Sequence, residues 1–415
     1  MNQSKLCRYI IIMGVVLLPL LAQGAQDTQT LSLKNLLSKV QERNPEILAA
    51  KEKWQASVNR SAKVSVLPDP QFGLMWQQIP SGTFSFGDAM PMYSFSQVIP
   101  FPGKLGTEGR MAKSMAEMDR SGLEAKIREI TARTKIIYYD LFYIYRAIQI
   151  NRENKKLLQR FADITEIKYS VGKSTQYDVL RARVERDILE NDLITLEQEK
   201  ESVEAKLNAL LNRPIDSPLG IPEEWKLDSF NLEYGDLEKI ALENRPELKE
   251  ASFAVERSKY NLSLADKQYL PDFMLTYKNR LGMGWDAEVM LSFPLWFWKQ
   301  SSGVKEAFSE KLRADASYQA MTNTVLSQVK NTLVKVQSGK RLVNLFKNSI
   351  LPQTTQTLEA AIIAYQNDKI DFLTLINTQK MLQDVKLKYW KAIVVYSQSL
   401  AELEQVLGVE LGGLK

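Results

Sequence analysis

The dominant feature of the hydrophobic pattern is a long seam of apolar side chains in the first half of the chain. No proline occurs between Pro102 and Pro214, so this stretch is free to run as helix. The apolar positions alternate spacings of four and three, as in a coiled coil. A helix over Leu105–Lys168 would extend about 95 Å. The seam consists of Leu123, Ile127, Ile130, Thr134, Ile137, Leu141, Ile144 and Ile148.

A second pattern, with a period of two, predicts strands. In the segment around residues 272–294, Phe273, Leu275 and Tyr277 alternate with Met274, Thr276 and Lys278, which gives one oily and one polar face. Tyr93 and Phe95 alternate with serines in the same way. The aromatic run Leu295-Trp296-Phe297-Trp298 is typical of a membrane interface. We therefore interpret these strands as membrane strands with a wet face and a lipid face, in preference to a small soluble sandwich.

The chain contains an internal duplication. In each half the sequence pattern predicts the same elements in the same order: a first helix (Leu31–Val66 and Tyr234–Tyr269), two strands, a very long helix, a tight turn and a long returning helix. Four landmarks recur in the same order about 200 residues apart. They are Asn44-Pro45-Glu46-Ile47 with Arg245-Pro246-Glu247-Leu248, Leu67-Pro68-Asp69 with Leu270-Pro271-Asp272, Tyr169–Lys173 with Tyr365–Lys369, and Ala209–Asn212 with Gln405–Gly408.

These features predict four segments. Residues 1–25 form a signal peptide, with Lys5 and Arg8 ahead of an apolar stretch too short to span a bilayer. The first repeat covers 26–213, with strands at about 70–101 and long helices at about 104–212. Residues 214–234, rich in Pro, Asp and Ser, form a linker. The second repeat covers 235–415, with strands at about 272–294 and long helices at about 300–411.

The number of strands predicts an oligomer. Two hairpins give four strands per chain, whereas single-chain membrane barrels begin at about eight strands. Four strands alone would leave unpaired edges in lipid. We expect several copies to pool their strands into one barrel, with the helical hairpins assembled into a second tube below it.

Composition excludes most enzyme chemistry. The chain of 415 residues has no histidine and one cysteine, so it offers no Ser-His-Asp or Cys-His arrangement and no histidine-based zinc site. No phosphate-binding glycine loop occurs. We predict no enzyme activity, no cofactor and no resident metal. The net charge of +5 is spread along the chain, and we predict no nucleic-acid partner.

The duplicated layout and several motifs resemble the TolC-like outer-membrane factors over essentially all of the mature sequence. The motifs are Tyr169-x-x-Gly172 followed by Asp178-Val179-Leu180, and the strand-to-helix junction Val98-Ile99-Pro100-Phe101-Pro102-Gly103-Lys104-Leu105. The junction is similar to the subgroup that serves heavy-metal efflux. The resemblance implies a mainly α fold with membrane β: a homotrimer with a twelve-stranded β-barrel in the outer membrane and an α-helical periplasmic barrel.

The resemblance also implies a function. The chain would be the passive outer-membrane channel of a tripartite efflux system in a Gram-negative bacterium, with a large periplasmic extension. Its partners would be outer-membrane lipid, a periplasmic adaptor protein and an inner-membrane pump that delivers small molecules or metal cations. Two alternatives stay open: a type I protein secretion channel, and a periplasmic coiled-coil scaffold without a pore.

Four residues are candidates for a periplasmic gate. In the family an aspartate of the first turn contacts a tyrosine of the second, and Asp178 and Tyr365 occupy these positions. Equally, Asp178 suits a helix N-cap and Tyr365 a coiled-coil core. The second turn departs from the family, with Asp368 in place of glycine. Asp368 and Asp371 would form rings of like charge in a trimer and favour cations.

Overall fold

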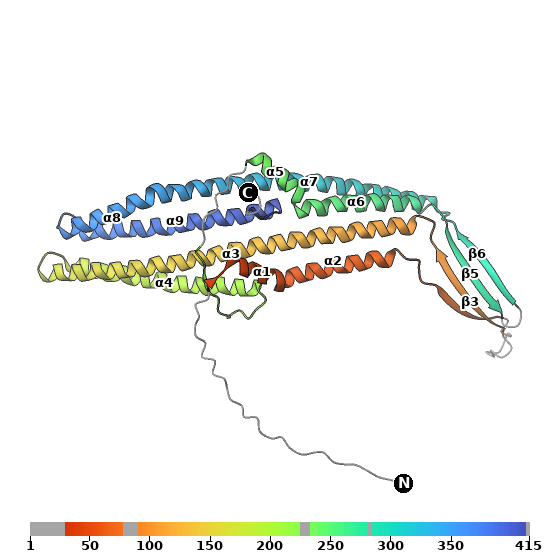
Figure 1. Cartoon of the computed structure of the whole chain (residues 1–415), viewed down its shortest axis with the longest axis horizontal. Helices are drawn as coiled ribbons and strands as arrows, with labels where there is room; N and C mark the ends of the chain where they lie inside the picture. Colours follow the sequence, from red (N-terminus) through yellow and green to blue (C-terminus); the bar gives the residue numbers. More distant parts are fainter. Residues whose placement is uncertain (1–29, 78–89, 225–232, 281–283, 412–415) are drawn as a thin grey trace, which may run out of the picture.

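The computed structural model describes residues 30–77, 90–224, 233–280 and 284–411. The predicted signal peptide, 1–25, lies outside these residues. The molecule is elongated, with the strands at one end and the turns between the long helices at the other (Figure 1). In Figure 1, α3 runs nearly the whole length of the helical part.

The two halves repeat the same order of elements. The first half contains β1 (Thr30–Leu31), α1 (Leu33–Arg43), α2 (Pro45–Val64), β2 (Gln71–Gln77), β3 (Met90–Ile99), α3 (Lys104–Ser170), α4 (Gln176–Leu210) and β4 (Ile221–Pro222). The second half contains α5 (Tyr234–Asn244), α6 (Pro246–Lys267), β5 (Asp272–Arg280), β6 (Gly284–Ser292), α7 (Phe297–Leu345), a π-helical segment η1 (Phe346–Ile350), α8 (Leu351–Gln366) and α9 (Phe372–Leu407).

The first helix of each half is broken, and here the prediction of one continuous helix is wrong. The breaks fall at Asn44 and at Arg245, each directly before a proline, and both residues have extended backbone angles. The proline ring excludes the preceding residue from the helical region and removes a backbone donor. Each proline then opens the next helix, where its missing N–H has no consequence.

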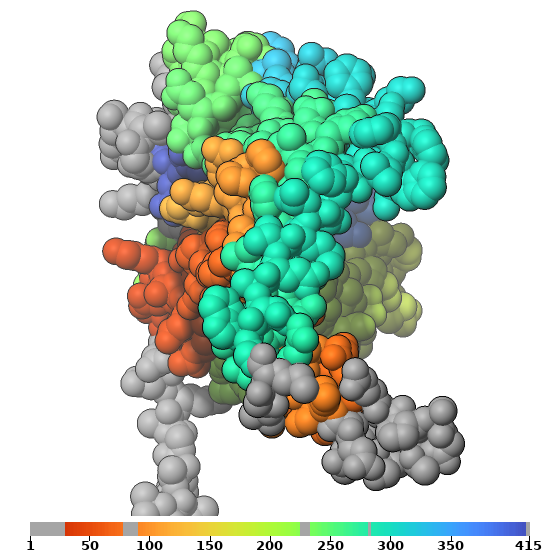
Figure 2. All heavy atoms as spheres, turned by 90° about the vertical axis from the view of Figure 1, so that its right-hand side faces the viewer, coloured from red at the N-terminus to blue at the C-terminus, as the bar shows by residue number. Residues whose placement is uncertain are grey.

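The strands form one antiparallel sheet in the order β2-β3-β5-β6. The register places Phe72 beside Phe95 and Phe95 beside Tyr277, so the aromatic side chains share one face. The large side chains of this face are exposed in the single chain; they are Phe72, Leu74, Trp76, Tyr93, Phe95, Leu275, Tyr277, Trp285, Val289 and Leu291. Figure 2 looks onto this strand end of the molecule, with β5 and β6 toward the viewer.

The opposite face of the sheet carries charged and hydroxyl side chains together with the methionines Met75, Met92, Met274 and Met290. Lys278 pairs with Glu288, and Arg280 pairs with Asp286, each at 2.5 Å. These cross-strand ion pairs stand beside a hydroxyl contact of 3.1 Å between Ser96 and Thr276. The predicted two-faced strands are thus present in both halves.

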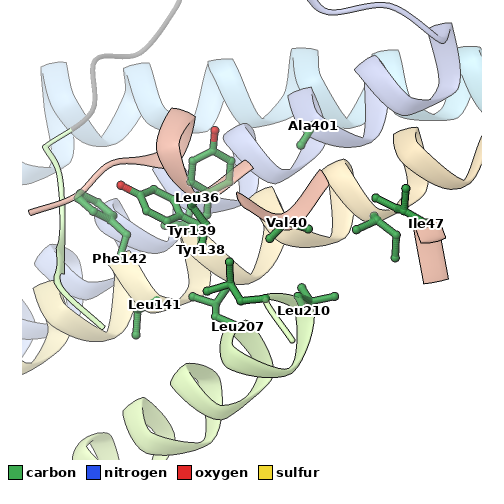
Figure 3. Packing of buried hydrophobic residues seen from close by; sticks show 13 residues of the cluster. Leu36, Val40, Ile47, Tyr138, Tyr139, Leu141, Phe142, Leu207, Leu210 and Ala401 are labelled. Atoms are coloured by element: carbon green, nitrogen blue, oxygen red, sulfur yellow. The ribbon is translucent and has the colours of Figure 1, made fainter. Parts of the chain in front are cut away.

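The apolar core of the first half lies near the middle of the molecule, where α1, α3, α4 and α9 meet (Figure 3). Leu36 and Val40 of α1 point toward Tyr138 and Tyr139 of α3. Leu207 closes the cluster from α4. Full burial of one such side chain stabilises the fold by about 1.5–3 kcal/mol. Because the cluster contains residues of α3, α4 and α9, it holds the two hairpins together near the middle of the molecule.

The helix that leads from the sheet to the turn is continuous in the first hairpin and interrupted in the second. α3 is one helix of 67 residues, whereas its counterpart is interrupted by η1 and continues as α8, with Pro352 in its first turn. None of the described helices combines the length and the hydropathy that a membrane-crossing helix requires.

Candidate functional site

The two turns that join the long helices lie together at the end of the molecule opposite the sheet (Figure 1). We call the turns, residues 171–175 and 367–371, together with the helix ends beside them, the tip. Each turn contains one residue with a left-handed backbone: Gly172 at φ 71° and Asp368 at φ 55°. All four predicted gate residues therefore lie at or beside these turns.

Asp178 acts within its own turn. It stands at the third position of α4, and Thr175 caps the helix: its side chain accepts from the backbone N–H of Asp178, while the Asp178 carboxylate accepts from the Thr175 N–H at 3.1 Å. This reciprocal capping box satisfies two backbone donors of the helix end. Ser174 also donates to this carboxylate, at 3.0 Å.

Tyr365 is a core residue that also makes a polar contact. Its side chain is 6% exposed and packs against Phe372, with ring centroids 5.8 Å apart. Its hydroxyl lies 3.2 Å from that of Thr165 in α3. Among the hydrogen bonds of the described residues none joins Asp178 to Tyr365, so the contact expected from the resemblance stays a prediction.

A lysine that the sequence analysis did not select joins the two turns. The Lys168 ammonium donates to the Asp368 carboxylate at 2.5 Å and to the Tyr365 carbonyl oxygen at 2.7 Å. It also lies 4.3 Å from the centre of the Tyr365 ring, within the range of a cation–π contact. Lys173 reaches the other Asp368 oxygen at 3.3 Å. We call these contacts the Lys168–Asp368 clasp.

Charge and backbone geometry both distinguish Asp368. The hydrogen bond from Lys168, reinforced by Lys173, lowers the pKa of Asp368 from its ordinary value. Asp368 also holds the left-handed position that Gly172 occupies in the first turn. Aspartate tolerates this conformation better than most residues but less well than glycine.

Asp371 has a separate role as the N-cap of α9. Its carboxylate accepts from the Thr374 backbone N–H at 2.9 Å, and the hydrogen bonds to Thr374 lower the pKa of Asp371. The two acidic residues of this turn thus differ in partner: Asp368 bonds across the hairpins and Asp371 caps its own helix.

Comparison with known sequences identifies the family. A profile described as outer membrane efflux protein matches residues 36–213 and 237–409. The chain belongs to the outer membrane efflux protein family. The two matched ranges correspond to the two halves of the fold, one on each side of the short connection that contains β4.

Several known proteins are similar to the chain. The cobalt-zinc-cadmium resistance protein CzcC of Cupriavidus metallidurans is 19% identical over 91% of this chain and 90% of the relative. The solved structure of CusC has a TM-score of 0.79 at 17% identity, covering 91% of this chain and 92% of CusC. The outer membrane protein VceC of Vibrio cholerae has a TM-score of 0.78 at 15% identity, with 91% and 96% covered.

Proposed function

We propose that this chain is one protomer of a trimeric outer-membrane conduit, which serves an inner-membrane pump through a periplasmic adaptor protein. The sheet carries the proposal. In the described sheet, β2 and β6 are edges, and one face is covered by exposed aromatic and aliphatic side chains. Such a sheet is stable in lipid only when its edges are paired. Three copies, with four strands each, would close a twelve-stranded barrel.

The face of the sheet that carries the ion pairs would line the lumen of this barrel. Its ion pairs, Lys278–Glu288 and Arg280–Asp286, are suited to water rather than to lipid. The long hairpins would then continue the lumen through the periplasm. Similarity to a relative that is named for resistance to cobalt, zinc and cadmium favours divalent metal cations as the cargo that the pump delivers.

The tip would be the gate of this conduit. The Lys168–Asp368 clasp joins the two hairpins of one protomer, and Lys168 is largely buried, with a side chain 14% exposed. Separation of the hairpins would break this contact and open the end of the tube. Asp371, exposed and charged, would contribute to a ring of carboxylates that favours cations.

Single-channel conductance in a planar bilayer tests the function and the gate together. We expect a small conductance for the wild-type protein and a larger one for Asp368→Asn, which removes the charge that binds Lys168. Asp371→Asn is the matched control: asparagine is an equally good N-cap, so this variant should lose cation selectivity while its open probability stays unchanged.

The outcomes separate the conduit from a periplasmic scaffold and test the clasp as its latch. If none of the three proteins conducts although each inserts as an oligomer, the conduit is wrong and a periplasmic scaffold takes its place. If both variants open the channel equally, loss of any tip charge is sufficient and the clasp is not the latch.

A further inference from the structure

A layer of polar side chains crosses the apolar core behind the tip. The core cluster there is built from α3, α4, α8 and α9, and its members are Leu158, Phe161, Ala182, Leu189, Leu358, Tyr365, Phe372, Leu375, Ile376 and Leu382. Among them lie Asn154 of α3, Glu185 of α4 and Gln379 of α9, which are 7%, 2% and 1% exposed. We call these three residues the polar layer.

Two ion pairs place the three residues at one level of the bundle. Glu185 forms an ion pair of 2.6 Å with Lys380, the neighbour of Gln379. On the other side, Lys155, the neighbour of Asn154, pairs with Glu190. Since Glu185 and Glu190 are little more than one helical turn apart, all three members of the polar layer lie at about the same height.

The polar layer is poorly satisfied. Neither side-chain polar atom of Gln379 has a hydrogen-bond partner among the described residues, and the Asn154 amide nitrogen also lacks one. A buried amide without a partner is destabilising relative to the same amide in water. An aliphatic side chain at the Gln379 position would continue the cluster from Ile376 to Leu382 at no such cost.

The polar layer lies between the two hairpins. Glu185 belongs to the first hairpin and Lys380 to the second, so their ion pair joins the hairpins in the same way as the Lys168–Asp368 clasp at the tip. Between these two levels the contact is mainly apolar, through Ala182, Phe372 and Ile376; the hydroxyl contact of Thr165 with Tyr365 lies close to the tip. Water that reaches the polar layer would hydrate its unpaired amides, whereas water that reaches the apolar residues gains no such bonds.

We propose that the polar layer sets the depth to which the two hairpins separate when the tip opens: they part from the tip as far as Asn154, Glu185 and Gln379, and water enters to that level. This inference rests on the proposed conduit and adds to it the segment that moves. The hydrated amides stabilise the separated state. The apolar core on the side of the polar layer away from the tip keeps the rest of the two hairpins in contact.

Thiol labelling tests the depth of separation. The only cysteine of the chain, Cys7, lies in the predicted signal peptide, so an introduced thiol is unique in the mature protein. We expect a charged maleimide to label Gln379→Cys slowly in the wild-type background, and at least about tenfold faster once Asp368→Asn opens the tip, which corresponds to about 1.4 kcal/mol. Ala401→Cys, buried in the central core, is the matched control and should stay protected in both backgrounds.

A reversible cross-link tests the same movement through conductance. Glu185→Cys with Lys380→Cys, bridged by a short bis-methanethiosulfonate reagent, should lower the conductance of Asp368→Asn channels, and a reductant should restore it. The same bridge between Lys335→Cys and Glu402→Cys, which joins α7 to α9 inside the second hairpin, should leave it unchanged.

The results distinguish the two proposals. The polar layer is not the limit of separation if Gln379→Cys remains as protected as Ala401→Cys, or if the bridged Glu185–Lys380 pair conducts as before, in channels that Asp368→Asn has opened. Absence of conductance in every protein overturns the conduit, while the labelling rates still report whether the hairpins part.

Discussion

In both halves of the molecule, the residue at the break in the first helix is hydrogen-bonded to the end of the returning helix. We call this contact the joint, and its side chains differ between the two halves. In the first half, the amide of Asn44 donates to the carbonyl oxygen of Leu210 at 3.0 Å, and so ties the broken first helix to the end of the returning helix. In the second half, the guanidinium of Arg245 donates to the carbonyl oxygen of Val406 at 3.1 Å. The contact is repeated although the residue types are unrelated.

The difference lies in what else each residue does. Asn44 also caps α2, accepting from the N–H groups of Glu46 and Ile47. Arg245 has no acceptor to offer a helix N-terminus and instead pairs with Glu247 at 3.2 Å. Duplication thus preserved the geometry of the joint, while its chemistry diverged. Asn44 makes three hydrogen bonds, and of these the second half keeps only the one to the carbonyl oxygen of the returning helix, because α6 has no side-chain cap.

The two halves differ most clearly in the residue that follows the returning helix. Both halves stop there on a left-handed residue, Asn212 at φ 52° and Gly408 at φ 73°. A β-carbon on Gly408 would lie 2.8 Å from the carbonyl oxygen of Asn244 and 3.1 Å from the α-carbon of Arg245. At the second joint the backbone therefore approaches position 408 too closely for any side chain, whereas the first joint has an asparagine at the corresponding position 212.

The largest expected effect follows from this difference. Gly408→Ala combines a left-handed alanine with backbone overlap, and should lower the free energy of unfolding by about 2–4 kcal/mol. Asn212→Gly should change it by less than about 1 kcal/mol. Midpoints of urea unfolding in detergent measure both; equal shifts would show that the two joints are packed alike.

The second prediction concerns the asparagine of the first joint. Asn44→Ala removes the cap of α2 and leaves the buried Leu210 carbonyl oxygen without its partner, a loss of about 2–3 kcal/mol. Asn44→Asp keeps the cap acceptor but not the donor, so it separates the two contributions. Arg245→Ala should be milder than Asn44→Ala by about 1 kcal/mol, because α6 has no side-chain cap to lose. The ordering fails if Arg245→Ala is the more destabilising of the two.

Much of this architecture was predictable because it repeats locally. The seam from Leu123 to Ile148 and the alternation from Phe273 to Tyr277 both have the period of the element they form. The sheet faces and both hairpins follow from those periods alone. The break at Asn44 was also available from the following proline, and the continuous-helix prediction gave that signal too little weight.

Other features depend on residues far apart in the chain. Lys168 and Asp368 are 200 positions apart, and no local pattern links a lysine at a helix end to an aspartate in a distant turn. Aligning the two turns offers a signal, because Asp368 stands where its counterpart is Gly172. The π-helical segment Phe346–Ile350 contains no glycine or proline, but Pro352 lies two residues beyond it and lacks the N–H that an α-helix would bond to the fourth residue before it, so the interruption had a local signal. The polar layer, in contrast, is visible only once three helices are placed together.

The third prediction compares the two turns. Asp368→Gly gives the second turn the residue of the first, which relieves backbone strain while it removes the ion pairs of an exposed carboxylate, and such exposed pairs contribute little to stability. Stability should therefore hardly change, although the clasp is lost. Asp368→Asn loses the clasp without relief of strain and should be slightly less stable than Asp368→Gly. Thermal midpoints beside conductance separate strain from latching; a variant that restores the wild-type closed state without a carboxylate would show that turn geometry alone holds the tip.

The smallest effect is the dependence of the tip on pH, and its sign follows from the lowered pKa of Asp368. A carboxyl group whose pKa is lower in the folded protein stabilises the fold above its ordinary value, about 3.9, and this contribution is lost as the pH falls through the lowered pKa. The clasp should thus persist through mildly acidic conditions, and wild-type conductance should rise only below about pH 3.9.

Two variants show which carboxyl group is responsible for such a rise. Asp371 also has a lowered pKa, from its bonds to Thr374, but it makes no contact with Lys168 in the described tip. Asp371→Asn should therefore keep the rise in conductance at low pH, whereas Asp368→Asn, already unlatched, should show none. A rise that begins well above pH 3.9 in the wild type, or one that survives in Asp368→Asn, would mean that another group controls the tip. In that case the difference between the two turns would concern helix capping and backbone strain, and the lysine of the first hairpin would hold the second by its contact with the Tyr365 ring and carbonyl oxygen alone.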